Sequence, residues 1–161
     1  MNIIETHNIR KNFGTKIALD GVSIHIPQNE ICGFLGPNGA GKTTLMRILT
    51  RILQPDDGSI LFNNRMFCDK DIVYIGYLPE ERGLYSGLDP ISTTFMREEI
   101  VTLQKQGTTV LLSTHDLNEA SALCSNIIFI NDARVRWQGE LSDIRKQYSS
   151  SHYRFTTEQA I

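Results

Sequence analysis

The chain has 161 residues, 40% of them hydrophobic, which is enough to fill the core of about one ordinary domain. Its formal net charge of -2 gives no overall attraction to nucleic acid or to an anionic bilayer, so we expect no nucleic-acid partner. The first residues lack the pattern of a signal peptide, and no apolar run approaches the roughly 20 residues that a membrane span needs. We therefore expect a cytoplasmic protein, with a peripheral position at the inner face of the plasma membrane left open.

The three cysteines, Cys32, Cys68 and Cys124, are odd in number and widely spaced. Each lies in or beside an apolar stretch, as buried thiols of a reducing compartment do. Their spacing matches neither a zinc site nor a disulfide framework.

The first part of the chain has the pattern of an antiparallel hairpin. Residues 3–13 and 21–27 carry apolar side chains at alternate positions. We expect turns at Gly14 and at Asp20-Gly21, because glycine and aspartate favour turn conformations.

A buried strand and a helix should follow the hairpin. Residues 30–35 form a nearly continuous apolar run, which is typical of a buried strand. Residues 43–53 place apolar side chains at helical spacing, and Pro55 and Gly58 should end that helix.

The rest of the chain continues the alternation of strands and helices. We predict one helix from Pro90 to near Gly107 and a short one over residues 117–124. Further strands are predicted over residues 59–62, 72–78, 109–113, 127–130, 134–137 and 153–157. Two of these, joined across Asn131-Asp132, should form a hairpin.

The motif with the most chemistry is GPNGAGKT at residues 36–43, which matches the G-x-x-x-x-G-K-[ST] pattern of phosphate-binding loops. A strand before it and a helix after it would aim backbone N–H groups and a helix N-terminus at a phosphate. The glycines permit close approaches that a Cβ would block, Lys42 brings a cation to the β and γ phosphates, and Thr43 offers a hydroxyl to Mg²⁺. The alternative is a glycine-rich turn that binds nothing. The expected nucleotide contacts in the loop are Gly36, Pro37, Asn38, Gly39, Ala40, Gly41, Lys42, Thr43 and Thr44.

At this loop the chain resembles the nucleotide-binding subunit of an ABC transporter, of the bacterial sodium-efflux and drug-exporter type. The loop continues as GPNGAGKTTLMRIL, with NFGTKIALDGVSIHIP before it and QPDDGSI after it. Three further stretches match in the family's order: IGYLPEERGLY resembles the glutamine loop region, SGLDP the D-loop, and LLSTHDLNEASALCSNIIFI the switch-histidine region. The resemblance implies an α/β fold, with a three-layer P-loop NTPase core and an N-terminal antiparallel β subdomain, and it implies ATP and Mg²⁺ as ligands.

The resemblance also implies roles for single residues. Phe13 stands where an aromatic residue stacks on adenine, and His115 matches the switch histidine that contacts the γ-phosphate, the one catalytic residue retained. Thr43 and Glu80 match metal-site positions, although Glu80 replaces the usual glutamine. Asp89 matches the D-loop aspartate that acts across the family's dimer. Without the resemblance, the pattern favours a core aromatic at Phe13 and an ordinary helix-start or loop histidine at His115 over functional roles.

One large segment of the family's pattern is missing. The helical subdomain, the LSGGQ signature and the strand with the Walker B aspartate and catalytic glutamate normally lie between the glutamine loop and the D-loop. Here Glu80 and Asp89 are only nine positions apart, as if an internal deletion had joined the chain near residues 85–86. Residues 1–140 would then be a shortened nucleotide-binding domain, and residues 141–161 the incomplete start of a C-terminal extension.

The missing carboxylates bear directly on hydrolysis, which needs an activated water and positive charge on the developing oxyanions. We expect Mg-ATP to bind and to be hydrolysed poorly or not at all, so enzymatic activity stays open. The apolar run at residues 127–130 before Asp132 imitates the missing strand, but turn chemistry explains it. Other substitute acids are more simply explained as loop, cap or solvated residues: Glu80, Glu81, Asp89 and Asp116.

Three functions therefore remain open: the ATPase subunit of an ABC exporter, an inert regulatory nucleotide-binding module, and an unstable non-functional remnant with an exposed sheet edge. In the family, ATP lies between the phosphate loop of one subunit and the signature of the other. Two copies of this chain would leave each nucleotide half covered, so a productive dimer would need an intact ABC ATPase subunit. The family's membrane permease would find most of its contact surface missing.

Overall fold

The computed structural model describes residues 1–78 and 90–143. An antiparallel sheet has the strand order β2-β1-β4-β5, with bounds β1 Asn2–Phe13, β2 Lys16–Pro27, β4 Asp57–Phe62 and β5 Arg65–Met66. A second sheet has the order β6-β7-β3-β8-β9, with bounds β3 Ile31–Leu35, β6 Gly76–Leu78, β7 Val110–Thr114, β8 Asn126–Asn131 and β9 Arg134–Glu140. The helices are α1 Lys42–Leu49, α2 Pro90–Lys105, α3 Leu117–Leu123 and the 3₁₀ helix η1 Asp69–Tyr74. Among the described residues, no helix combines the length and the apolar character that crossing a membrane requires.

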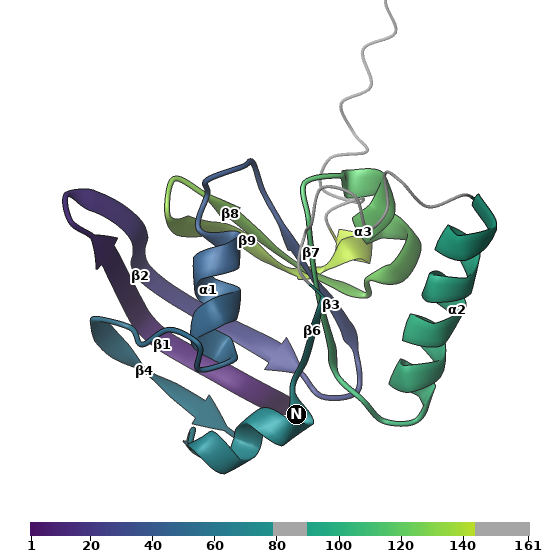
Figure 1. The fold of residues 1–161 in the computed structure, drawn as a ribbon, viewed down its shortest axis with the longest axis horizontal. Helices are drawn as coiled ribbons and strands as arrows, with labels where there is room; N and C mark the ends of the chain where they lie inside the picture. The colour runs from purple at the N-terminus through teal and green to yellow at the C-terminus, as the bar shows by residue number, and fades with distance from the viewer. Residues whose placement is uncertain (79–89, 144–161) are drawn as a thin grey trace, which may run out of the picture.

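Two apolar cores lie on opposite faces of the second sheet, which is parallel except for β9 (Figure 1). In the first core, α1 packs between the antiparallel sheet and one face of β3, β7 and β8. In the second core, α2 and α3 cover the other face. This arrangement confirms the predicted three-layer α/β core with an antiparallel subdomain built from the N-terminal strands.

The predicted hairpin and its turn at Gly14 are present, but the second turn, predicted at Asp20-Gly21, is absent. β1 and β2 pair antiparallel around Gly14, whereas Asp20 and Gly21 lie inside β2. Arg10 donates to Asp20 Oδ1 at 2.9 Å, and Arg134 donates to Asp20 Oδ2 from Nε and Nη2 at 2.9 and 2.6 Å. The hydrogen bond from Arg134 holds the pKa of Asp20 below its usual value, and the charge of Arg10 adds to this effect. Asp20 therefore links β2 to β1 and to β9 by hydrogen bonds. The prediction of a turn at Asp20-Gly21 is wrong.

The helix after the phosphate loop is shorter than predicted. α1 ends at Leu49, not at residue 53, and Arg51 has a left-handed φ of 55°. The Arg51 guanidinium lies 5.4 Å from the Phe67 ring centroid, and its Nε is 2.7 Å from Asp69 Oδ1. These contacts to a later segment accompany the early end, and Ile52 is left 71% exposed.

The strand predicted over residues 72–78 is only partly correct. Asp69–Tyr74 forms the 3₁₀ helix η1, and only Gly76–Leu78 is extended, as β6. The Asp71 carboxylate accepts hydrogen bonds from Arg65 and from the backbone N–H of Cys68 at the start of η1. The local apolar pattern gave no sign of this capping arrangement.

The remaining predicted elements are present with small shifts in their bounds, except the strand over residues 153–157, which falls outside the described residues. The cysteine prediction holds for two of three residues: Cys32 and Cys124 are buried, whereas Cys68 is exposed. Burial raises the pKa of the Cys32 thiol, and it raises the pKa of the Cys124 thiol to about 12.

Candidate functional site

The phosphate loop leaves the sheet at its centre. All five residues of β3 are buried, between β7 and β8 with parallel pairing on both sides. The chain then turns through the loop into α1. Loop residues 37–39 are exposed, whereas Gly36, Ala40 and Gly41 are buried. The tip of the loop therefore faces solvent at the carboxyl ends of the parallel strands, while the residues at both ends of the loop are buried.

Two glycines make this turn possible. A Cβ on Gly36 would lie 2.1 Å from the carbonyl oxygen of Ile130, and a Cβ on Gly41 would lie 2.5 Å from the carbonyl oxygen of Ala18. Both glycines have positive φ, 155° and 111°. Each position excludes a side chain by space and by backbone conformation, so the loop backbone sits closer to β2 and β8 than any other residue type permits. Tight backbone of this kind is what presents N–H groups to phosphate oxygens.

The Lys42 side chain folds back over the phosphate loop and contacts its first residues. Its side chain is only 4% exposed, and its Nζ donates to the carbonyl oxygens of Gly36 at 2.5 Å and of Pro37 at 3.2 Å. The ammonium therefore lies across the loop that it belongs to. A buried ammonium held by carbonyl oxygens supplies concentrated positive charge for an incoming anion.

The first turn of α1 faces the same opening. Gly41 is its N-cap with no side-chain cap, and the first turn contains no acidic residue. Thr43 is exposed, and Thr44 is partly exposed. The positive end of the helix dipole is thus left for an anion, with two hydroxyls beside it. These features fit a triphosphate with its magnesium ion.

His115 lies at the end of the neighbouring strand. β7 pairs in parallel with β3, with Thr114 opposite Leu35, so His115 leaves the sheet beside the phosphate loop. The side chain of His115 is exposed. The structure thus brings the predicted switch histidine and the loop to the same edge of the sheet.

Phe13 lies at the end of β1, and its side chain is 51% exposed. Lys11 Nζ lies 5.8 Å from the ring centroid. Phe13 is therefore not the buried core aromatic that its pattern alone would suggest, and its ring is open to a partner.

The candidate acids fall into two groups. Glu80, Glu81 and Asp89 lie outside the described residues. Asp116 is the N-cap of α3, and its carboxylate accepts from the backbone N–H of Asn118 at 2.7 Å. Asp132 lies in the β8–β9 turn with φ of 49°, and its carboxylate pairs with Arg136 at 3.3 Å. The two described acids thus have the cap and turn contacts that the sequence indicated.

A depression beside the loop was not anticipated from the sequence. It has a volume of about 370 Å³ and is lined by Ile17, Asp20, Gly39, Asp132, Ala133, Arg134 and Arg136. It exists because the turn after β8 reaches the same sheet edge as the loop, and the backbone N–H of Asp20 donates to the carbonyl of Ala133 at 2.8 Å. No local pattern signals this meeting of β2 with a turn more than a hundred residues away.

Comparison with known proteins assigns the family. A family model described as ABC transporter matches residues 19–155, which is more than half of the chain. The uncharacterized ABC transporter ATP-binding protein YhaQ of Bacillus subtilis is 24% identical over 219 aligned positions, covering 90% of this chain and 74% of that protein. The zinc import ATP-binding protein ZnuC of Rickettsia bellii is 40% identical over 86 residues, covering 53% of this chain and 34% of that protein.

Solved structures show the same fold. The ATP-binding subunit of an ABC transporter superposes with a TM-score of 0.79 at 19% identity, covering 91% of this chain and 93% of that one. A second structure, an ATP-binding cassette of an ABC transporter in its ADP conformation, gives a TM-score of 0.75 at 18% identity, covering 93% and 95%. This chain therefore belongs to the ABC transporter family and is homologous to its ATP-binding subunits.

Proposed function

We propose that this chain binds ATP with Mg²⁺ through residues 36–44 and hydrolyses it poorly or not at all. One observation carries the binding proposal: the loop backbone lies so close to Ile130 and Ala18 that no Cβ fits at Gly36 or Gly41, while the Lys42 ammonium lies across its mouth. A fold that serves only as a turn does not require a buried lysine there.

In this proposal, different residues around the loop bind the phosphates, the magnesium ion and the adenine. The loop amides and Lys42 take the β and γ phosphates, and Thr43 supplies a hydroxyl to the magnesium ion, which neutralises phosphate charge. His115, which follows β7 beside the phosphate-loop strand, contacts the γ-phosphate in this proposal. The exposed ring of Phe13 is available to stack on the adenine. Glu80, as a second metal contact, rests on the family resemblance alone.

Poor hydrolysis is supported by what the chain lacks relative to its family. The alignment with YhaQ spans 219 positions, 58 more than the 161 residues of this chain, so the relative has a long stretch without a counterpart here. β6 pairs directly with β7 through Gly76–Val110, Tyr77–Leu111 and Leu78–Leu112. The family's strand with the two catalytic carboxylates belongs between the glutamine loop and the D-loop, and the sequence has no equivalent of it.

The β6–β7 pairing also bears on the alternative functions. A three-residue parallel pairing covers part of the β7 edge, and both apolar cores are built. These features favour a folded, inert nucleotide-binding module over an unstable remnant. In this proposal residues 1–140 form the shortened nucleotide-binding domain, and residues 141–161 begin a C-terminal extension.

Partners follow from the family and from the missing signature. A lantibiotic transport ATP-binding protein, SrtF of Streptococcus pyogenes, and the zinc import protein ZnuC are among the relatives, so no single cargo is assigned here. We propose that a productive dimer requires an intact ABC ATPase subunit, and that contact with a membrane permease, at the inner face of the plasma membrane, is weak.

Calorimetric titration with Mg-ATP tests the binding proposal. Wild type should bind, and Lys42→Ala should lose about 2–4 kcal/mol of binding free energy, because a buried cation on the phosphates is removed. Lys105→Ala, which removes an exposed lysine at the end of α2, is the matched control and should bind as wild type does. Equal affinities for wild type and Lys42→Ala would refute the role of Lys42.

Steady-state phosphate release tests the hydrolysis proposal. The purified chain should release phosphate no faster than its Lys42→Ala variant, whereas an intact ABC ATPase subunit assayed alongside should release it readily. Release by wild type that Lys42→Ala abolishes would show that a carboxylate elsewhere activates the water, and the proposal of an inert module would be wrong.

A further inference from the structure

Ser113 in β7 carries a buried hydroxyl that has no hydrogen-bond partner among residues 1–78 and 90–143. The residue is 4% exposed, and its Oγ makes no hydrogen bond with any of the described residues. Buried side-chain oxygens are nearly always hydrogen-bonded, and an orphan one needs a reason. Two other buried residues of this segment carry hydroxyls with partners: Thr109 Oγ1 accepts from the backbone N–H of Asn29 at 2.9 Å, and Thr114 Oγ1 accepts from that of Asp116 at 3.0 Å.

The side to which Ser113 projects follows from the two cores. Leu111 packs in the core that contains α1, whereas Val110 and Leu112 pack in the core under α2 and α3. Side chains alternate between the faces of a strand, so Ser113, two residues after Leu111, projects to the α1 side. That is the side on which the phosphate loop runs into α1.

The height of Ser113 in the sheet places it just below the loop. Ser113 is opposite Phe34 in the parallel pairing, and Thr114 is opposite Leu35, the last residue before Gly36. The hydroxyl is therefore one residue short of the strand ends, on the face where Lys42 and Thr43 begin the helix. A ligand held above the loop would reach this hydroxyl through a water and not by direct contact.

We propose that Ser113 is a positioning residue for the nucleotide's metal: its hydroxyl accepts a hydrogen bond from a water coordinated to the bound Mg²⁺. Mg²⁺ in phosphate sites keeps several waters, whose hydrogens need acceptors. The Ser113 hydroxyl beside the loop offers such an acceptor, and the water would give it the hydrogen bond that it lacks within the described part of the chain. The inference rests on the proposed function, because it assigns a further residue to the same Mg-ATP site.

Calorimetric titration with Mg-ATP and with metal-free ATP tests the proposed role of Ser113. Ser113→Ala should weaken Mg-ATP binding about 5- to 10-fold, the value of one hydrogen bond to a polarised water, and should leave metal-free ATP in EDTA within about 2-fold. Ser113→Cys, which nearly keeps the volume but accepts hydrogen bonds weakly, should behave like Ser113→Ala. The melting temperature of the nucleotide-free protein should not fall in either variant, since no hydrogen bond is lost.

Thr109→Val is the matched control, because it removes a satisfied hydroxyl at the opposite end of the same segment. It should lower the melting temperature and leave both nucleotide affinities unchanged. An equal loss of Mg-ATP and metal-free ATP in Ser113→Ala, or no loss in either, would overturn the role of Ser113 alone. A wild-type protein that binds neither form would overturn the proposed function, and this inference with it.

Discussion

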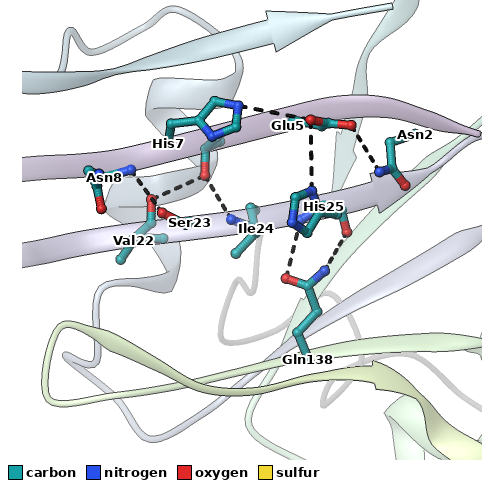
Figure 2. A network of polar contacts seen from close by, with 10 residues as sticks. Asn2, Glu5, His7, Asn8, Val22, Ser23, Ile24, His25 and Gln138 are labelled. Atoms are coloured by element: carbon teal, nitrogen blue, oxygen red, sulfur yellow. Dashed lines mark hydrogen bonds and ion pairs between the residues drawn. The ribbon is translucent and has the colours of Figure 1, made fainter. Parts of the chain in front are cut away.

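The side-chain amide of Gln138 in β9 makes two hydrogen bonds with the backbone of His25 in β2. Nε2 of Gln138 donates to the His25 carbonyl at 2.9 Å, and Oε1 accepts from the His25 N–H at 3.2 Å (Figure 2). β2 and β9 are edge strands of different sheets. One glutamine thus supplies the paired donor and acceptor that a neighbouring strand would supply, and it joins the two sheets.

Gln138→Ala should lower the free energy of unfolding by about 1–2 kcal/mol, because two partly exposed hydrogen bonds are lost. Gln138→Glu should cost a similar amount, since a carboxylate cannot donate to the His25 carbonyl. Urea unfolding measures both. Gln106→Ala, at an exposed glutamine just after α2, serves as the control. A Gln138→Ala variant as stable as this control would show that the two Gln138–His25 hydrogen bonds do not stabilise the protein.

The loop glycines should differ in their tolerance of alanine. A Cβ at Gly39 would meet no atom of the described residues within 4 Å, so Gly39→Ala should cost only about 1–2 kcal/mol for its left-handed φ of 82°. Gly36→Ala must displace the Ile130 carbonyl from 2.1 Å, and should cost at least about 1 kcal/mol more, as overpacking does.

Urea unfolding of both variants, followed by Mg-ATP titration, checks this order. If Gly36→Ala proved no less stable than Gly39→Ala, the close packing of Gly36 against the Ile130 carbonyl in β8 would be contradicted. We expect Gly36→Ala also to bind nucleotide more weakly, because the loop backbone must move.

The parts of the fold that the sequence predicts are those set by short-range pattern. The run that became β3, the glycine motif and the start of α1 are all visible in one stretch of the chain. The errors arose from distant partners. Arg51 leaves the helix beside Phe67 and Asp69, and Asp20 is held inside β2 by Arg134. Contacts of this kind leave no periodicity in the sequence.

The candidate site divides in the same way. The phosphate loop and His115 are recognisable by motif, and parallel pairing of β3 with β7 brings them together as the family resemblance implied. Ser113 gave no signal, because a serine in an apolar run looks ordinary until the structure shows that it is buried and has no partner among the residues described. The depression lined by Arg134 and Arg136 depends on a turn returning to the loop, which only the assembled sheet shows.

The Arg65–Asp71 pair should make stability depend on acid pH. The Arg65 hydrogen bonds hold the pKa of Asp71 well below its usual value, and the Cys68 N–H adds to this effect, although burial opposes it. A lowered folded-state pKa means that the charged carboxylate stabilises the protein above the unfolded-state pKa of about 3.9, and that this contribution is lost as pH falls further.

Urea unfolding between pH 2 and pH 6 should therefore show a steeper loss of stability for wild type than for Asp71→Asn below about pH 4. Arg65→Gln should flatten the acid limb in the same way, because it removes the first cause of the lowered pKa. Parallel acid limbs in all three proteins would show that the pair does not set the dependence.

Phe13 should discriminate between a nucleotide and a bare polyphosphate. Its ring is 51% exposed, so Phe13→Ala should change the free energy of unfolding little. If the ring stacks on adenine, the variant should lose about 1–3 kcal/mol of ATP binding, the range measured for base–aromatic stacking, and bind tripolyphosphate as wild type does. Phe95→Ala, on an even more exposed phenylalanine of α2, is the matched control and should change neither ligand. Equal losses of ATP and tripolyphosphate in Phe13→Ala would indicate that the hairpin end supports the loop instead of holding the base.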